Sequence, residues 1–338
     1  MRAAWASGAA SLAGYALGGL GSILMLHHVR PSPSSPLGVN AHLTVTPDFL
    51  DQIISALKQD GIDLISMDEL VERLSTGRTS ARRFATFTLD DGYRDNLQHA
   101  WPVFKKHDVP FTIYIAPGLI DGSAILWWEI LEQVVSAALS MTVPGHGIMR
   151  CASIEEKQHV YGLLLAYLTS EVAEQDQFSV VRSMAERHGV DWAAFGPENL
   201  LNWAEIRQLA SEPLCTIGSH GINHYALKRL PEIKAVEELR GAVDLIEFHT
   251  GKRPAHLAYP YGYETAVGER DVELASRVGL SSAVTTRHGT IQRAHRNHIH
   301  ALPRISLNGR FQDITYPRVM MTGFTTLLAN RGRRVVTV

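Results

Sequence analysis

The stretch FATFTLDDGYRDN, residues 84–96, sets the expected fold because it joins a strand to two adjacent carboxylates. Phe84–Leu89 is a short apolar run with the aromatic and β-branched residues typical of strands. Asp90 and Asp91 follow it directly, and Gly92 comes next. Two like charges at the end of a buried strand are unfavourable unless something positive lies between them. The stretch therefore indicates a strand end that holds a positive charge.

Similar strand-like runs recur along the chain and alternate with helix-like segments. Residues 22–29 (SILMLHHV) precede the stretch, and VPFTIYIAPGLI, LCTIGSH, AHLAYPYG and SSAVTTR follow it. Such βα repeats predict an α/β fold with a parallel sheet, either open or rolled into a barrel. In barrels, chemistry gathers at the carboxyl ends of the strands.

The βα alternation stops between about residues 125 and 201, where long helical patterns predict a helical insertion. The main domain is expected over residues 22–310, with a peripheral segment and basic tail over 311–338. Residues 1–21 are small and weakly apolar, and they predict an N-terminal helix. This segment lacks both the continuous apolar stretch of a membrane span and the basic start and leucine-rich core of a signal peptide. We therefore expect a cytoplasmic protein.

The bulk composition is that of a globular protein, with 338 residues of which 45% are hydrophobic and 20% charged. A net charge of −2 provides no basic field, which argues against nucleic-acid binding. Two cysteines are too few for a disulfide framework or a cysteine zinc site. The 16 histidines make a search for metal ligands worthwhile.

Three polar clusters lie at predicted strand ends: Asp90–Asp91–Gly92, His220-x-x-x-His224 and residues 259–262 (YPYG). The two histidines are four residues apart and can share one face of a helical turn. Two imidazoles and a carboxylate form an open ligand set for a catalytic zinc. The two aspartates cannot point the same way on an extended backbone, so one can bind metal while the other takes another role, such as general base. Each cluster alone is more often a turn, and the signal is their joint occurrence.

These motifs resemble those of the polysaccharide deacetylases, the NodB-homology group also called carbohydrate esterase family four. TLDDG is similar to the family's TFDDG motif, SHGINH to its H-[ST]-x-x-H zinc motif, and LAYPYG to its R-x-P-Y-G-type motif. ILMLHHV is similar to a strand of many bacterial members, so the resemblance spans about residues 22–310. It implies a distorted (β/α)-barrel of about seven parallel strands.

The resemblance also implies a reaction and its residues. The reaction is hydrolysis of an N-acetyl group, usually from an N-acetylhexosamine of a glycan. Asp90 would be the catalytic base, and a backbone N–H near Tyr261 would stabilise the oxyanion. Asp91, His220 and His224 would hold a divalent metal, with zinc expected and cobalt, nickel or manganese as alternatives.

Three positions depart from the family pattern. Gly221 replaces a serine or threonine, Ala258 stands where the family has the arginine that pairs with the catalytic aspartate, and Arg304 stands where it has the histidine of its L-x-H motif. We expect Arg304 to fill the place left by Ala258 and to pair with Asp90, which would keep that carboxylate ionised. Arginine cannot supply the proton for the leaving amine, because its pKa is too high.

Another residue must therefore act as the general acid, and His27 is the first candidate, with His28 second. The candidate substrate contacts are Tyr93, Trp128, Pro260 and Tyr261. Glu129 is interpreted as part of a solvated helix face, and Asp95 and Asn96 as caps of the helix that follows the DDG loop.

The sequence thus favours a metal-dependent deacetylase that acts on an N-acetylated glycan or glycan precursor. An amidase or O-acetyl esterase on the same scaffold is one alternative. A catalytically silent carbohydrate-binding homologue is the other, because the L-x-H histidine is missing. Neither nucleic acid nor a stable membrane span is expected.

Overall fold

The computed structural model describes residues 14, 17–32, 35–77 and 82–338. Most of the N-terminal helix expected over residues 1–21 therefore lies outside the described residues. No helix within the described ranges is long and apolar enough to cross a membrane.

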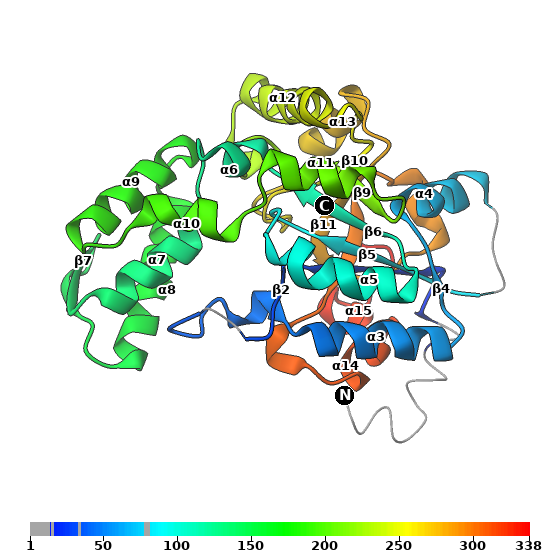
Figure 1. Ribbon diagram of the computed structural model, residues 1–338, viewed down its shortest axis with the longest axis horizontal. Helices are drawn as coiled ribbons and strands as arrows, with labels where there is room; N and C mark the ends of the chain where they lie inside the picture. The colour runs from blue at the N-terminus through cyan, green and yellow to red at the C-terminus, as the bar shows by residue number, and fades with distance from the viewer. Residues whose placement is uncertain (1–13, 15–16, 33–34, 78–81) are drawn as a thin grey trace.

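A closed barrel of seven parallel strands forms the centre of the chain, as predicted (Figure 1). The strand Gly21–Leu26 closes the ring because it pairs with both Phe84–Leu89 and Leu302–Ser306. Around the barrel the order is β1 (Gly21–Leu26), β5 (Phe84–Leu89), β6 (Phe111–Ile115), β9 (Cys215–Ser219), β10 (His256–Ala258), β11 (Ser282–His288) and β12 (Leu302–Ser306). A short strand, β4 (Asp63–Leu64), also pairs with β5.

The strands are apolar runs because both faces of each are covered. β1, β5 and β6 are buried along their whole length, as parallel strands between a filled interior and a layer of helices must be. The interior is filled by Ile23, Tyr114, Val284 and Leu302, among others. Because all seven strands are parallel, their carboxyl ends meet at one mouth.

Helices pack around the outside of this barrel. They are α3 (Pro47–Gln59), α4 (Met67–Thr76), α5 (Trp101–His107), α6 (Pro117–Asp121), α11 (Trp203–Ser211), α12 (Glu232–Thr250), α13 (Glu269–Arg277), α14 (Thr315–Met320) and α15 (Phe324–Ala329). Thr46 caps α3 by accepting a hydrogen bond from the Phe49 N–H at 3.2 Å, with Pro47 at the first helical position. The segment 311–338 thus contributes two short helices, α14 and α15.

Short elements complete the connections near the mouth. β2 (His28–Val29) pairs with β3 (Thr44–Val45). The segment η2 (Asn96–Ala100) is a π-helical turn that continues into α5. Single 3-10 turns are η1 (Ala41–Leu43), η3 (Leu227–Arg229), η4 (Arg293–Asn297) and η5 (Gly309–Phe311).

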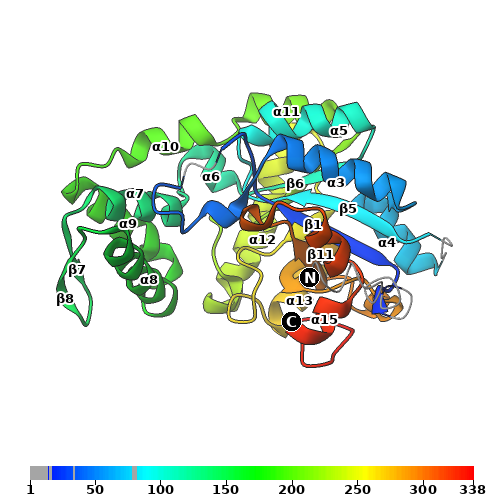
Figure 2. The ribbon, with the colours of Figure 1, turned by 90° about the horizontal axis from the view of Figure 1, so that it is seen from below.

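A group of helices between β6 and β9 stands at one side of the barrel (Figure 1). It consists of α7 (Trp127–Ala137), α8 (Ile154–Ser170), α9 (Glu174–Arg187) and α10 (Trp192–Asn199). The sequence predicts helices alone here, but an antiparallel hairpin of β7 (Ser140–Val143) and β8 (Gly147–Arg150) joins α7 to α8. Figure 2 shows this hairpin at the end of the group away from the barrel. Apolar side chains from α7, α8 and α9 build a separate core, so the group packs as a unit.

Candidate active site

Asp90 and Asp91 lie directly after β5, and both are buried. The prediction that the Asp90 and Asp91 side chains point in different directions because they alternate along an extended strand is wrong about the reason. β5 ends at Leu89, and Asp91 has a left-handed backbone with φ of +73°, as does Gly92. This left-handed residue, the second after the strand, turns its own carboxylate away from that of Asp90. The two carboxylates consequently meet different partners.

His220 and His224 follow β9 and reach Asp91. Their ring centroids are 4.7 Å apart, although residues 220–224 form an irregular loop and not the helical turn considered from the spacing. His220 Nδ1–H donates to the Ala258 carbonyl at 2.6 Å, which leaves Nε2 as the free nitrogen that faces Asp91. His224 has a left-handed backbone with φ of +58°.

The loop between the histidines is held from α12 by Glu238. Its carboxylate accepts the N–H groups of Ile222 and Asn223 at 2.9 and 2.8 Å, and the Asn223 side chain at 2.6 Å. Gly221 has φ of +70°, a conformation that suits glycine and strains serine or threonine. Glu238 and Gly221 together shape this loop without the hydroxyl that the resemblance leads one to expect.

Asp91, His220 and His224 fit a metal site. One ligand atom from each lies within 4.8 Å of the others, and all three residues are buried. Asp91 Oδ1 accepts no hydrogen bond from the described residues, and the two imidazole nitrogens lie 3.4 and 3.3 Å from it. A buried carboxylate oxygen without a donor is costly, and a cation between the three groups would satisfy it. Two histidines and one carboxylate are the donor set of catalytic zinc sites with open positions.

Asp90 is paired with Arg304, the contact expected from the two departures in the sequence. The Arg304 guanidinium donates two hydrogen bonds to Asp90, at 2.8 and 2.7 Å, and a third at 2.9 Å to the Thr285 carbonyl. Burial alone would raise the pKa of Asp90, but the charge and hydrogen bonds of Arg304 hold this pKa below its usual value. The carboxylate is therefore ionised at neutral pH.

His27 lies at the mouth beside the same carboxylate, with its Nε2 3.9 Å from Asp90 Oδ2. Burial lowers the pKa of His27, and the nearby charges of Asp91 and Asp90 offset this only in part. His28, the second candidate for the general acid, belongs to another environment. Both of its ring nitrogens face carboxylates, Asp95 at 2.7 Å and Glu129 at 3.1 Å. The side chains of His27 and His28 point to opposite sides of the chain just after β1, so only His27 faces the mouth.

A cavity of about 400 Å³ opens over this cluster. Its floor contains His27, Asp90 and the three candidate metal ligands. The wall includes residues that sequence reasoning missed: Asn40, His42, Leu43, Tyr161, Leu165 and Thr169. They come from η1, from Asn40 directly before it, and from α8. No motif marks them, because their place in the wall depends on how the helix group packs against the barrel.

Two of the four candidate substrate contacts line this cavity, Trp128 and Tyr261. The Trp128 ring lies 4.9 Å from the His224 ring and 6.0 Å from that of Tyr261. Tyr261 has a left-handed backbone with φ of +60°, and its N–H makes no hydrogen bond to the described residues. Trp127 holds the Tyr261 hydroxyl through its indole N–H at 2.9 Å.

The other two candidates do not line the cavity. Tyr93 is fully buried behind the site, where its ring packs on His28 and its hydroxyl donates to Glu129. Pro260 is buried next to Tyr261, and its Cγ lies 3.6 Å from the position of a Cβ at Gly221. Each supports a neighbouring site residue and is screened from the cavity by packing.

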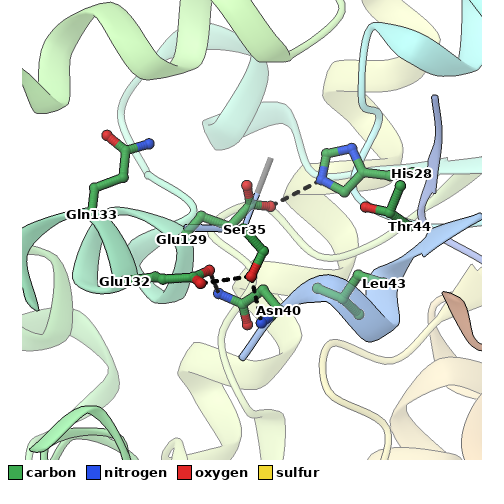
Figure 3. A pocket seen from close by; sticks show the side chains of 8 residues that line it. All are labelled: His28, Ser35, Asn40, Leu43, Thr44, Glu129, Glu132 and Gln133. Carbon is green, nitrogen blue, oxygen red and sulfur yellow. Dashed lines mark hydrogen bonds and ion pairs between the residues drawn. The ribbon is translucent and has the colours of Figure 1, made fainter. Parts of the chain in front are cut away.

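Glu129 is also buried, which corrects its interpretation as part of a solvated face. Figure 3 shows it reaching His28, one turn of α7 away from Glu132. Glu132 accepts hydrogen bonds from the Ser35 hydroxyl at 2.6 Å and the Asn40 amide at 2.9 Å. The two carboxylates thereby fasten α7 to the chain segment 28–40.

Asp95 belongs to the same polar cluster and is not the helix cap expected from the sequence. It makes no side-chain cap hydrogen bond and accepts instead from His28 and from the Val29 N–H at 3.1 Å. Burial lowers the pKa of His28, but the adjacent carboxylates outweigh this and the pKa is raised. Asn96 likewise donates its side-chain amide to the His27 carbonyl at 2.8 Å.

Comparison with known proteins decides the family. The family model described as polysaccharide deacetylase matches residues 77–281, which is more than half of the chain. The chain belongs to the polysaccharide deacetylase family. Its members are hydrolases of amide or ester bonds, and the family generally depends on a metal, for which this chain has the Asp91, His220 and His224 cluster.

Individual relatives are distant. YxkH of Bacillus subtilis (strain 168), whose name assigns it provisionally to the polysaccharide deacetylases, is 25% identical over 119 residues, or 35% of this chain. The match spans 40% of that relative's length.

Among solved structures, the Streptococcus pyogenes deacetylase PplD in complex with acetate has a TM-score of 0.59 at 17% identity, covering 88% of this chain and 97% of its own. IcaB from Ammonifex degensii has a TM-score of 0.56 at 16% identity, with 89% and 96% coverage. At these identities the likeness establishes the fold.

Proposed function

We propose that this polysaccharide deacetylase family member is a metal-dependent enzyme that removes N-acetyl groups from an N-acetylhexosamine-containing glycan or glycan precursor. The observation that carries the proposal is the pairing of Asp90 with Arg304 directly beside the Asp91, His220 and His224 cluster. An ionised base and a set of metal ligands then border one cavity.

The three ligands would hold a divalent metal, and zinc suits their chemistry best. When bound, such a metal polarises a carbonyl oxygen and lowers the pKa of a water molecule, which is the activation that amide hydrolysis needs.

The chain's own residues supply the proton transfers and the orientation. Asp90 takes a proton from the attacking water, and Arg304 keeps this carboxylate ionised and fixed in direction. The free N–H of Tyr261 is available to donate to the carbonyl oxygen as negative charge develops there. His27, whose Nε2 is 3.9 Å from Asp90 Oδ2, takes the water proton from Asp90 and passes it to the leaving nitrogen. Trp128 offers an aromatic face against which the C–H surface of a pyranose can pack.

The O-acetyl esterase alternative has one observation in its favour. An amine must be protonated to leave, whereas an alcohol leaves more readily, and this site has Arg304 where the family places its acid. The lowered pKa of His27 also leaves it uncharged at neutral pH. Assays with chitooligosaccharides and O-acetylated xylan separate the two activities, and release of acetate from xylan alone would favour the esterase.

The central test measures acetate release by wild type and Asp90→Asn, each with and without a chelator. We expect the substitution to lower kcat by at least about 100-fold, because it removes the base, and the chelator to abolish the wild-type activity. Asp244→Asn is the matched control, since Asp244 is exposed on α12. Activity that survives both treatments would refute the mechanism, and saccharide binding without turnover would point to the silent binding homologue.

A further inference from the structure

The helix group contributes a wall of the cavity whose polar groups are largely engaged elsewhere. The Tyr161 hydroxyl lies within hydrogen-bond distance of Asn40 Oδ1 at 3.4 Å and the Trp128 carbonyl at 3.3 Å. The Thr169 hydroxyl donates to the Leu165 carbonyl at 2.8 Å. Apart from the Trp128 indole N–H, the side-chain donors of this wall thus have partners within the described protein.

The surface that remains on this side is apolar. Leu165 of α8, Leu43 of η1 and the Trp128 ring all line the cavity, and Leu165 and Trp128 are only partly buried by the helix-group core. A sugar hydroxyl placed against these side chains would lose its water and gain no partner, which is unfavourable. An apolar group placed there would be stabilised in proportion to the area that it buries.

Other residues that line the cavity have free polar groups. The Ser306 hydroxyl at the end of β12 makes no hydrogen bond to the described residues. His42 uses only Nδ1, which donates to the Val39 carbonyl at 3.0 Å, and its Nε2 is free as an acceptor. These groups, together with His27, can receive the hydroxyls of a sugar ring. The cavity lining therefore combines an apolar surface of Leu43, Trp128 and Leu165 with polar groups that are free to bind a sugar ring.

We propose that the substrate is an N-acylated amino sugar that carries an apolar substituent, and that Leu43, Trp128 and Leu165 bind this substituent. The inference rests on the proposed deacylation of an amino sugar and specifies its substrate further. The apolar substituent has two possible positions, a longer N-acyl chain or an apolar aglycone on the anomeric carbon. A cavity of about 400 Å³ has room for one sugar ring with such a group.

The test compares acyl release from three pairs of substrates by the metal-loaded wild type. The first pair is methyl and hexyl β-glycosides of N-acetylglucosamine, and the second is the N-acetyl and N-hexanoyl forms of the methyl glycoside. The third pair sets N-acetylglucosamine against its β-1,4-linked dimer. In one of the two apolar pairs, we expect the compound with the longer chain to have a KM about tenfold lower than its partner, as the burial of roughly two methylene groups would produce. We expect the KM of the dimer to differ less from that of the monomer.

Two variants locate the effect. Leu165→Gln makes the wall polar and should move the KM ratio of the favoured apolar pair toward one. Ile154→Gln is the matched control, because Ile154 is an exposed apolar residue of the same helix that does not line the cavity. It should keep the wild-type ratio.

The outcomes are distinct. The inference is overturned if neither apolar pair shows a lower KM, if the dimer shows the largest gain, or if Leu165→Gln keeps the full preference. In these cases hydrolysis of the methyl glycoside still supports the proposed function. If the wild type releases no acyl group from any of the compounds, the proposed function fails, and the inference falls with it.

Discussion

Asp90 shows how a single buried charge can be balanced from a different place in the sequence. The resemblance places an arginine at position 258, on β10, whereas this chain has Ala258 there and Arg304 on β12. Both strands end at the same mouth, so a guanidinium from either can reach the carboxylate. The buried Asp90 carboxylate requires a cation that binds both of its oxygens, and this cation can come from position 304 as well as from position 258.

Removing this cation should move the pH dependence of activity. In Arg304→Gln, burial would raise the pKa of Asp90, because only the smaller effects of His220 and His27 would remain to oppose it. The acid limb of the kcat/KM profile should then shift to higher pH, with kcat/KM lowered roughly tenfold in mildly acidic buffer because less of the base is ionised. A full pH profile with N-acetylated chitooligosaccharides measures this shift.

Arg304→Lys is the matched variant, since it keeps the charge and loses the bidentate geometry. It should shift the acid limb less than Arg304→Gln does. A profile in Arg304→Gln whose acid limb stays at the wild-type position would show that Asp90 is not the group that titrates.

Gly221 supports a second prediction at this scale. Its φ of +70° is strained for any other residue, although a Cβ there would meet only ordinary contacts, the nearest at 3.4 Å from Glu238. Gly221→Ser should therefore lower the free energy of unfolding by about 1 kcal/mol, measured by urea denaturation. It should also lower activity, because the serine would displace the loop between the two histidines that are candidate metal ligands.

The control is Gly251→Ser, at φ of +72° with no neighbouring atom within 4 Å, because Gly251 does not line the cavity. It should cost a similar free energy of unfolding and leave activity unchanged. An unfolding free energy of Gly221→Ser equal to that of wild type would contradict the assignment of strain.

At the scale of elements, α7 links the helix group to the barrel. On one turn it carries Trp127 and Trp128 to the cavity, and Glu129 and Glu132 reach the segment 28–40. Glu129 and His28 are 101 residues apart in sequence, and their contact is buried. Because a buried ion pair holds two surfaces in one arrangement, this pair helps to set where the indole faces the site.

His28 should make stability depend on pH in a definite direction. Its folded-state pKa is raised above 6.5, so its stabilising contribution is complete below that pH and is lost as pH rises through the folded value. His28→Gln should therefore cost about 2 kcal/mol of unfolding free energy in mildly acidic buffer and clearly less in alkaline buffer. Urea denaturation across this pH range measures the difference.

His146→Gln serves as control, because His146 is exposed in the hairpin turn of the helix group. It should change the unfolding free energy little at any pH. A cost for His28→Gln that grows with pH would reverse the predicted sign and exclude a charged His28.

Elements with strong periodicity could be predicted from the sequence, while contacts between distant elements could not. β5 and β9 appear close to where the apolar patterns place them, because local spacing reports burial. The metal-ligand candidates could be placed because each lies at a strand end. Glu129 and Asp95 were misread, because a carboxylate buried by a histidine far away in sequence looks locally like a surface residue or a cap.

The same limit applies to backbone conformation. Asp91, His224 and Tyr261 are three of only five non-glycine residues with positive φ among the described residues. Nothing in their sequence context marks this conformation, which costs free energy and persists only where tertiary packing enforces it. Its concentration at one site indicates that the fold stabilises the site at some local cost.

At the scale of the whole molecule, the site depends on the barrel being closed. Its groups come from the ends of β1, β5, β9 and β12. β1 pairs with both β5 and β12 only because the ring is closed, and β9 is separated from β5 by β6. The unfolded chain has no preformed cluster of these side chains, so a ligand of the cluster must bind the folded state more tightly than the unfolded state. Binding at this point is therefore coupled to the stability of the entire barrel.

The last prediction follows from this coupling and separates the two aspartates. Zinc at about 1,000 times its dissociation constant should add about 4 kcal/mol to the unfolding free energy, and a chelator should remove it, lowering Tm by several degrees in a thermal scan. Asp91→Asn should lose this zinc-dependent shift, because it removes a ligand that accepts no other hydrogen bond among the described residues. Asp90→Asn should keep the shift even if its baseline Tm falls, since Asp90 is engaged by Arg304 and is not one of the three clustered ligands. Equal shifts in both variants would contradict the assignment of Asp91 as ligand, and loss of the shift in Asp90→Asn alone would exchange the roles of the two adjacent carboxylates.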